Sequence, residues 1–225
     1  MELRAEGVSK RFFRNSKNTN YFYAVKATDF VLPAGKLTEI TGRSGSGKST
    51  FLNILSGLLE PTEGKVLLDG TDLYALADGP RSVLRNRSIG VIPQGQTGLH
   101  SLTVLENVKL PYALYGETAA DETAMALLEQ VGIAELRDAY PNELSGGEMR
   151  RLAIARALIR KPGILLADEP TGDLDDANTQ TVLRLLRQAA DAGTAVLLVT
   201  HEREAAAYAD CIYHMESGVL TGETV

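Results

Sequence analysis

The segment that decides the fold is Gly42-Arg43-Ser44-Gly45-Ser46-Gly47-Lys48-Ser49, which fits the pattern G-x-x-x-x-G-K-[ST]. An apolar stretch, Leu37–Thr41, precedes this segment and predicts a short strand. Residues 49–58 follow it with leucine and isoleucine at helical spacing, and they predict a helix that closes near Gly57. Glycines between a strand and a helix let backbone N–H groups point inward, and the helix N-terminus adds partial positive charge. The segment therefore predicts a loop that binds phosphate groups; a plain glycine-rich turn is the alternative.

Side chains of this loop have separate predicted roles. The Lys48 ammonium group would reach the β- and γ-phosphates of a nucleotide, and the Ser49 hydroxyl would bind Mg²⁺. We expect the nucleotide to contact residues along the whole segment, namely Gly42, Ser44, Gly45, Ser46, Gly47, Lys48, Ser49 and Thr50.

The run Ile164-Leu165-Leu166-Ala167-Asp168-Glu169 reads as an apolar strand that ends in two carboxylates. A parallel strand delivers its carboxyl end to the crevice where ligands bind. Asp168 can hold Mg²⁺ through water, and Glu169 can polarise the water that attacks a phosphate. Acidic residues are common at strand ends, so this prediction depends on the pairing with the phosphate loop.

A second candidate anion site is Leu144-Ser145-Gly146-Gly147-Glu148, directly before a predicted helix. A serine and two glycines in this place offer a hydroxyl and free N–H groups to an anion. The alternative is a plain helix N-cap with Glu148 as an acid of the first turn. The segment is far from Lys48 in the sequence, so a single fold need not bring the two anion sites together.

Apolar periodicity predicts strands and helices in alternation along most of the chain. Two of the predicted strands are apolar throughout, which is typical of a parallel sheet covered on both faces. A helical stretch from about residue 95 to 160 interrupts the alternation, so we expect one domain with a helical subdomain. The predicted strands are 2–8, 22–32, 65–68, 88–93, 163–167 and 194–200, and the predicted helices are 118–132, 145–159 and 176–192.

Length and composition exclude several classes of protein. The 225 residues, 44% hydrophobic and 23% charged, suit one soluble domain with a buried core. One cysteine, Cys211, excludes an internal disulfide, and no apolar run approaches the ~18 residues of a membrane span. The net charge of −6 argues against nucleic acid as a partner. Charged residues in the first ten positions exclude a signal peptide, so a cytosolic location is expected.

Taken together, these segments resemble the ATP-binding cassette (ABC) ATPases over nearly the whole chain. The loop 42–49 is similar to the Walker A motif of that family, and 164–169 is similar to Walker B with its catalytic glutamate. The segment 144–148 resembles the ABC signature, which in this family acts on ATP held by the partner subunit. Three further motifs match in order: Gln94 for the Q-loop, Gly172-Asp173-Leu174-Asp175 for the D-loop, and His201 for the H-switch.

The resemblance implies ATP and Mg²⁺ as ligands, with residues for each role. The implied catalytic residues are Glu169, His201 and Gln94, and the implied Mg²⁺ ligands are Ser49, Gln94 and Asp168. The implied nucleotide contacts outside the phosphate loop are Ser145, Gly146, Gly147, Asp175 and Phe12.

At Phe12 the sequence leaves an alternative open, and at Glu148 it departs from the usual residue of the family. Phe12 falls where the family keeps an aromatic ring that stacks on adenine; core packing and a role for neighbouring Phe13 are the alternatives. Glu148 ends the signature where glutamine is commoner in the family, so it places a negative charge near the partner's ATP.

The resemblance also implies an architecture and partners. The fold class is α/β: a P-loop NTPase core with a parallel sheet, an N-terminal antiparallel β subdomain and an inserted helical subdomain. The chain, 1–225, would be a single ABC ATPase domain, with the core at about 1–94 and 160–225 and the helical subdomain at about 95–159. The expected partners are a second copy or a homologous ATPase subunit in an ATP-sandwich dimer, and an integral membrane permease. The expected location is cytoplasmic, peripheral on the inner face of the cell membrane.

The segments 167–175 and 102–108 resemble one branch of the family. That branch contains bacterial ATPases of lipoprotein release, macrolide efflux, antimicrobial-peptide resistance and cell division. It implies an ATP-hydrolysing subunit that powers an exporter or extraction-type transporter. The alternative is a regulatory ATPase of the cell-division type, which signals through a membrane partner without transport.

Other nucleotide-binding classes fit the sequence less well. The guanine-recognition tetrapeptide N-K-x-D of GTPases is absent. Lys48 and Asp168 are only 120 residues apart, which leaves no room for the coiled-coil insertion of chromosome-maintenance ATPases. A small-molecule kinase would not need the 144–148 segment or His201.

Overall fold

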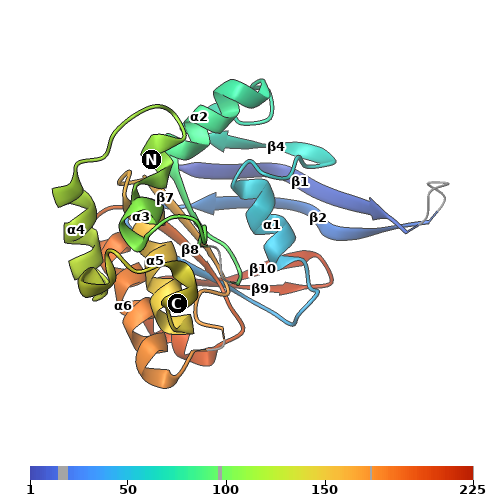
Figure 1. The fold of residues 1–225 in the computed structure, drawn as a ribbon. Helices are drawn as coiled ribbons and strands as arrows, with labels where there is room; N and C mark the ends of the chain where they lie inside the picture. Colours follow the sequence, from blue (N-terminus) through green and yellow to red (C-terminus); the bar gives the residue numbers. More distant parts are fainter. Residues whose placement is uncertain (15–19, 96–97, 173, 225) are drawn as a thin grey trace.

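The computed structural model describes residues 1–14, 20–95, 98–172 and 174–224, and this part of the chain contains two β-sheets (Figure 1). The first sheet is antiparallel with strand order β2-β1-β4-β5. The second has the order β10-β9-β3-β8-β7-β6, in which every neighbouring pair is parallel except β9 with β10. The strands are β1 (Leu3–Phe13), β2 (Tyr21–Leu32), β3 (Leu37–Thr41), β4 (Glu63–Leu68), β5 (Thr71–Asp72), β6 (Ile89–Ile92), β7 (Ile164–Asp168), β8 (Ala195–Val199), β9 (Cys211–Glu216) and β10 (Val219–Thr224).

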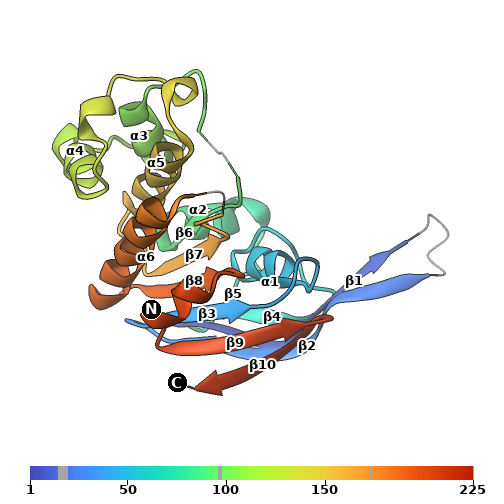
Figure 2. The same cartoon turned by 90° about the horizontal axis from the view of Figure 1, so that it is seen from below.

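Helices cover both faces of the parallel sheet, and a group of them stands apart from the two sheets (Figure 2). This arrangement confirms the predicted α/β fold class. The helices are α1 (Lys48–Leu55), α2 (Asp78–Ser88), α3 (Val104–Ala113), α4 (Asp121–Gln130), α5 (Gly146–Leu158) and α6 (Asp176–Asp191), with 3₁₀ turns η1 (Ala134–Leu136), η2 (Pro141–Glu143) and η3 (Arg203–Tyr208).

Two apolar clusters form the core, one on each face of the parallel sheet. Alternate residues of a strand point to opposite faces, so Leu197 of β8 packs with Phe51 of α1 while Leu198 packs with Leu186 of α6. Both faces of β7 and β8 are therefore buried, which is why these strands read as continuous apolar runs. The helix α1 contacts strands of both sheets, and this contact fixes the loop before it in place.

The structure corrects the predicted element boundaries in several places. The strand predicted at 2–8 continues to Phe13, where it pairs with β2. The helix predicted from 118 begins at Asp121, with Ala120 as a cap that makes no side-chain hydrogen bond. Acidic residues in its first turn compensate, because they interact favourably with the helix dipole.

The strand β5, the helix α2 and the β9–β10 hairpin were not anticipated from the sequence, and α3 was anticipated only as part of the helical stretch 95–160. The helix α2 is mostly polar, and only its last residue is buried, so it has no apolar stripe to reveal it. The β9–β10 hairpin closes at Ser217 and Gly218, whose φ values of 49° and 78° are those of a tight type I′ turn. Within the described residues, no helix is long and apolar enough to cross a membrane.

Candidate nucleotide-binding site

The phosphate loop lies between β3 and α1, and two of its glycines are required by their surroundings. Gly42 and Gly47 have φ values of 147° and 113°, which favour glycine. A Cβ on Gly42 would lie 2.2 Å from the Met215 carbonyl oxygen, and one on Gly47 would lie 2.1 Å from that of Ala24. The close approach of β9 and β2 therefore shapes the loop and explains the glycines at these positions.

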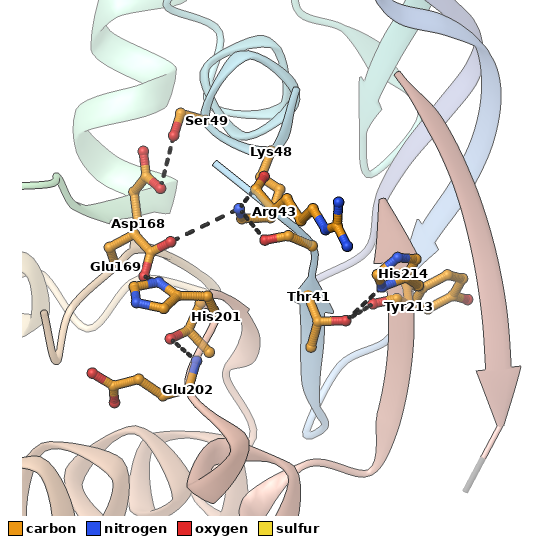
Figure 3. A network of polar contacts seen from close by, with 12 residues as sticks. Thr41, Arg43, Lys48, Ser49, Asp168, Glu169, His201, Glu202, Tyr213 and His214 are labelled. Carbon is orange, nitrogen blue, oxygen red and sulfur yellow. Dashed lines mark hydrogen bonds and ion pairs between the residues drawn. The ribbon is translucent and has the colours of Figure 1, made fainter. Parts of the chain in front are cut away.

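Lys48 is the buried cation of the loop, with 6% of its side chain exposed. Its Nζ donates to the carbonyl oxygens of Gly42, at 2.7 Å, and Arg43, at 3.2 Å. The same Nζ is 3.9 Å from Oε1 of Glu169 (Figure 3). The predicted phosphate-binding cation and the predicted catalytic carboxylate are thus brought together across the two motifs.

Ser49 and Asp168 form the second contact between the loop and β7. The Ser49 hydroxyl donates to Oδ1 of Asp168 at 3.0 Å. Burial raises the pKa of the Asp168 carboxyl above its ordinary value; the Ser49 hydrogen bond opposes this, and the neighbouring Glu169 adds to it. A bound cation would stabilise the ionised carboxyl and act in the opposite direction to burial.

Glu169 directs its side chain between two other predicted residues. One carboxylate oxygen faces Lys48, and the other, Oε2, lies 2.9 Å from Nδ1 of His201. Glu169 has a φ of 48°, a left-handed backbone conformation that non-glycine residues rarely adopt. Its N–H donates to the Val199 carbonyl at the end of β8, which holds this conformation in place.

A cavity of about 520 Å³ opens beside the phosphate loop. Ten of the residues that line it were predicted as site residues, and the other six lie just after β1, in β2 and in the β9–β10 turn. The lining residues are Phe12, Arg14, Phe22, Tyr23, Ala24, Ser44, Gly45, Ser46, Gly47, Lys48, Ser49, Thr50, Gln94, Glu169, Ser217 and Gly218.

A neighbouring cavity of about 600 Å³ shares Ser44, Gln94 and Glu169 with the first. His201 and Glu202 line it, as does Arg43, the one phosphate-loop residue for which the sequence predicted no role. Gln94, the predicted Q-loop residue, borders both cavities.

Phe12 lines the nucleotide-sized cavity and is 37% exposed, so packing in the core does not account for its ring. It pairs across the strands with Phe22, and the two ring centroids are 5.9 Å apart. Phe13 packs instead near Tyr21, on the opposite face of the hairpin. The structure therefore separates the two neighbours that the sequence left as alternatives.

Five predicted nucleotide contacts do not line either cavity: Gly42, Ser145, Gly146, Gly147 and Asp175. Asp175 caps α6, and its carboxylate accepts from the N–H of Asn178 at 2.8 Å and from the Asn178 amide at 3.0 Å. Both bonds hold the pKa of Asp175 below its ordinary value, and the bond from the Asn178 N–H has the larger effect. Asp173 of the same motif lies outside the described residues.

Ser145 caps α5 in a reciprocal arrangement with Glu148. The Ser145 hydroxyl and the Ser145 N–H both donate to Oε2 of Glu148, each at 2.8 Å. The Glu148 N–H donates back to the Ser145 hydroxyl oxygen at 3.4 Å. The Ser145 N–H and hydroxyl hold the pKa of Glu148 below its ordinary value, so this carboxyl stays ionised near neutral pH.

Some residues around the site carried no signal in the sequence. Arg150 of α5 donates to the carbonyl oxygens of Pro93, at 3.1 Å, and Gly95, at 3.3 Å, which flank Gln94. Phe22 lines the cavity because the β1–β2 register places it opposite Phe12, and Arg14 lines it just after the end of β1. These contacts depend on tertiary packing, which the sequence pattern did not predict.

Comparisons with known proteins agree on one family. The family described as ABC transporter matches residues 25–172. The chain is 42% identical over 221 residues to the "Lipoprotein-releasing system ATP-binding protein LolD" of Xanthomonas campestris pv. campestris (strain 8004), covering 97% of this chain and 91% of that protein. It is also 42% identical to the LolD protein of Shewanella oneidensis, covering 97% and 95% of the two chains.

Solved structures give the same result. The fold is similar to that of the dimeric ABC transporter cassette MJ0796, with a TM-score of 0.91 and 33% identity over 99% of this chain and 98% of that chain. A second MJ0796 structure, a dimeric post-hydrolysis state bound to ADP and Pi, matches with the same TM-score of 0.91.

Proposed function

The chain belongs to the ABC transporter family and is an ATPase, and we propose that it powers an exporter or extraction-type membrane system by ATP-driven dimerisation. The observation that carries this proposal is the convergence of Lys48, Glu169 and His201 at one end of the parallel sheet. The names of the LolD relatives, which refer to lipoprotein release, support an extraction-type system over the regulatory alternative.

The site is suited to a nucleotide with Mg²⁺. Ser49, Asp168 and Gln94 offer the hard oxygen donors that this ion prefers, and the first two are 3.0 Å apart. The Ser46 hydroxyl oxygen is buried and has no hydrogen-bond partner within the described residues, so it is available to donate to a phosphate oxygen. Bound at these residues, Mg²⁺ would neutralise charge on the β- and γ-phosphates.

The side chains of this chain divide the chemistry between them. Lys48 would turn from the carbonyl oxygens it now contacts to the more negative phosphates. Glu169 would accept a proton from the attacking water or polarise it. An ionised Glu169 only accepts hydrogen bonds, so His201 donates to it from Nδ1, which orients the carboxylate.

Ser145 and Asp175 serve the nucleotide of a partner subunit in this proposal. Both are away from the cavities of their own chain, and both lie at helix N-termini, where N–H groups favour anions. A two-fold dimer can place Lys48 of one copy opposite Ser145 of the other, giving two equal composite sites. The dimeric state of the MJ0796 structures supports this arrangement.

A permease is the proposed membrane partner, and the chain would lie on the cytoplasmic face of the cell membrane. The segment after Gln94 is the proposed contact, because Leu99 is 46% exposed and Arg150 links this region to the helix α5. A movement of α5 would therefore shift the backbone on either side of Gln94, next to the proposed permease contact.

Affinity purification from solubilised membranes tests the function. We expect an integral membrane permease to co-purify and the complex to hydrolyse ATP. Lys48→Ala should keep the permease and the circular dichroism spectrum but lose nucleotide affinity, because the cation over the phosphates is removed. Lys65→Ala is the matched control, since the exposed Lys65 side chain forms a surface ion pair with Glu6, away from the phosphate loop. Normal ATP affinity in Lys48→Ala, or a complex without a membrane protein, would contradict the proposal.

A further inference from the structure

The hydrogen bonds of Ser145 carry an inference that rests on the proposed dimer. A serine hydroxyl has one proton, and in this structure Ser145 donates it to the Glu148 carboxylate. A phosphate oxygen is an acceptor, so Ser145 can bind the partner's phosphate only by donating that same proton. The two acceptors, Glu148 and the phosphate, therefore compete for it.

Glu148 is a strong competitor. A hydrogen bond to an ionised carboxylate is roughly twice as strong as one between neutral groups. Its Oε2 accepts from both the hydroxyl and the N–H of Ser145, so the side chain is held in place by two bonds. Within the described residues, no lysine or arginine lies within ion-pair distance of Glu148. Arg150, two residues along the chain, donates to the carbonyl oxygens of Pro93 and Gly95. Arg151 bonds Asn178 and acts on Glu148 only through its charge.

We propose that Glu148 is a positioning residue that holds the Ser145 hydroxyl away from the partner's nucleotide and so weakens ATP-driven dimerisation. Dimer formation has to break the Ser145–Glu148 hydroxyl bond and bring a phosphate next to a carboxylate that makes no direct ion pair within the described residues. Each subunit contributes one such exchange, so the effect enters twice in a symmetric dimer.

The variant Glu148→Gln removes the competitor and keeps the cap. Glutamine completes a capping box as glutamate does, so the start of α5 should stay folded. Its neutral amide oxygen holds the Ser145 proton less tightly, which lowers the cost of donating it to phosphate. We expect about a 5-fold gain per site, hence on the order of 20-fold in the dimer dissociation constant.

Glu143→Gln is a matched control. Glu143 also accepts a backbone N–H within a capping box, that of Tyr140, and lies two residues before Ser145 without bonding it. The same unit of negative charge is removed nearby, while the Ser145 hydroxyl keeps its partner. We expect less than about a twofold change from this variant.

The experiment measures ATP-dependent dimerisation against protein concentration by sedimentation velocity, in chains that also carry Glu169→Gln to slow hydrolysis. With the added Glu148→Gln the dimer should form at on the order of 20-fold lower protein concentration, and the melting temperature should be unchanged. Dimerisation at the same or a higher concentration would overturn the proposal, as would an equal gain from Glu143→Gln, which would show a general charge effect. If no chain dimerises with ATP at any concentration, the proposed dimer itself fails, and this inference with it.

Discussion

Glu169 shows how single residues of this chain combine a strained backbone with a placed side chain. Its left-handed conformation costs on the order of 1 kcal/mol, and such outliers cluster at functional sites. The strain points one carboxylate oxygen at Lys48 and the other at His201. Glu169 therefore lies between the phosphate loop and the neighbouring cavity that His201 lines.

Glu169→Gln should bind ATP and hardly hydrolyse it. The amide cannot accept the water proton, and positioned acid–base groups are typically worth ~10²–10⁴ in rate. The loss of the negative charge also reduces repulsion against the γ-phosphate. Steady-state phosphate release and ATP-dependent gel filtration are the measurements, and a persistent dimer with slow turnover is expected. Turnover equal to the unmodified chain would place the base elsewhere.

If Phe12 stacks on adenine as predicted, Phe12→Ala should weaken ATP binding by ~1–3 kcal/mol, because the stacked ring would be lost. Phe13→Ala is the control, since the Phe13 ring packs near Tyr21 on the opposite face of the hairpin. Titration with a fluorescent ATP analogue measures both. A larger loss of affinity in Phe13→Ala would show that the neighbour contacts adenine.

The residues that the sequence could predict at this scale are those set by local chain geometry. The phosphate loop and the Asp168–Glu169 pair follow from a strand, a turn and a helix start, all within a few residues. Phe22 and Arg150 could not be predicted in this way, because their contacts join segments far apart in the sequence. The roles of the predicted residues remain predictions until variants such as these are measured.

Among the secondary-structure elements, β3 contains a buried carboxyl group, that of Glu39. Glu39 is fully buried in the middle of this strand, and neither of its carboxylate oxygens has a hydrogen-bond partner in the described part of the chain. Burial raises the pKa of Glu39 from 4.5 to about 7. The strand leads directly into the phosphate loop, so the protonation of Glu39 affects the element that supports the site.

The contribution of Glu39 to the stability of the folded chain should fall as the pH rises from 4.5 to about 7. The unfolded chain ionises this carboxyl near 4.5 and the folded chain near 7, so this contribution is largest at or below pH 4.5. It falls between these two values and is level above the upper one. The loss is about 3 kcal/mol, at 1.4 kcal/mol for each pKa unit.

Denaturant unfolding at pH 5 and pH 8 measures this effect in the unmodified chain and in Glu39→Gln. The variant should lack the Glu39 contribution, so the difference in unfolding free energy between the two chains should change by about 2–3 kcal/mol across this range. A constant difference at both pH values would show that Glu39 does not titrate as its burial demands.

The elements that were predicted have an apolar periodicity or a capping pattern in their sequence, and those that were missed do not. The cap of α5 follows from a serine with a glutamate three residues later. The polar helix α2 buries only its last residue, and the β9–β10 hairpin depends on the turn at Ser217 and Gly218 rather than on an apolar pattern.

At the scale of the whole molecule, the parallel sheet was predictable but its strand order was not. Apolar strands alternating with helices indicate a covered parallel sheet. In the order β9-β3-β8-β7, β3 pairs with β8 and β9, which lie far along the chain from it. Local sequence patterns carry no information about such pairings. This order brings the ends of β3, β7 and β8 together, so the loop after each one contributes to the nucleotide site.

The same topology leaves the N-termini of α5 and α6 outside the nucleotide cavities of their own chain. In the proposed dimer, the N-termini of α5 and α6 complete the nucleotide site of a second copy of the chain. Lys48→Ala removes one half of a composite site, and Ser145→Arg blocks the other half. Each homodimer then has no intact site, whereas a mixed dimer has one site with both lesions and one with none.

ATP occlusion after mixing these two variants is the most direct test. With random subunit exchange half of the dimers are mixed, so about one quarter of all sites should be intact. We expect occluded nucleotide to reappear on mixing, at about a quarter of the unmodified level. Occlusion that stays at the level of the separate variants, with exchange verified by differently tagged chains, would show that Ser145 serves the nucleotide of its own chain and would contradict the shared site.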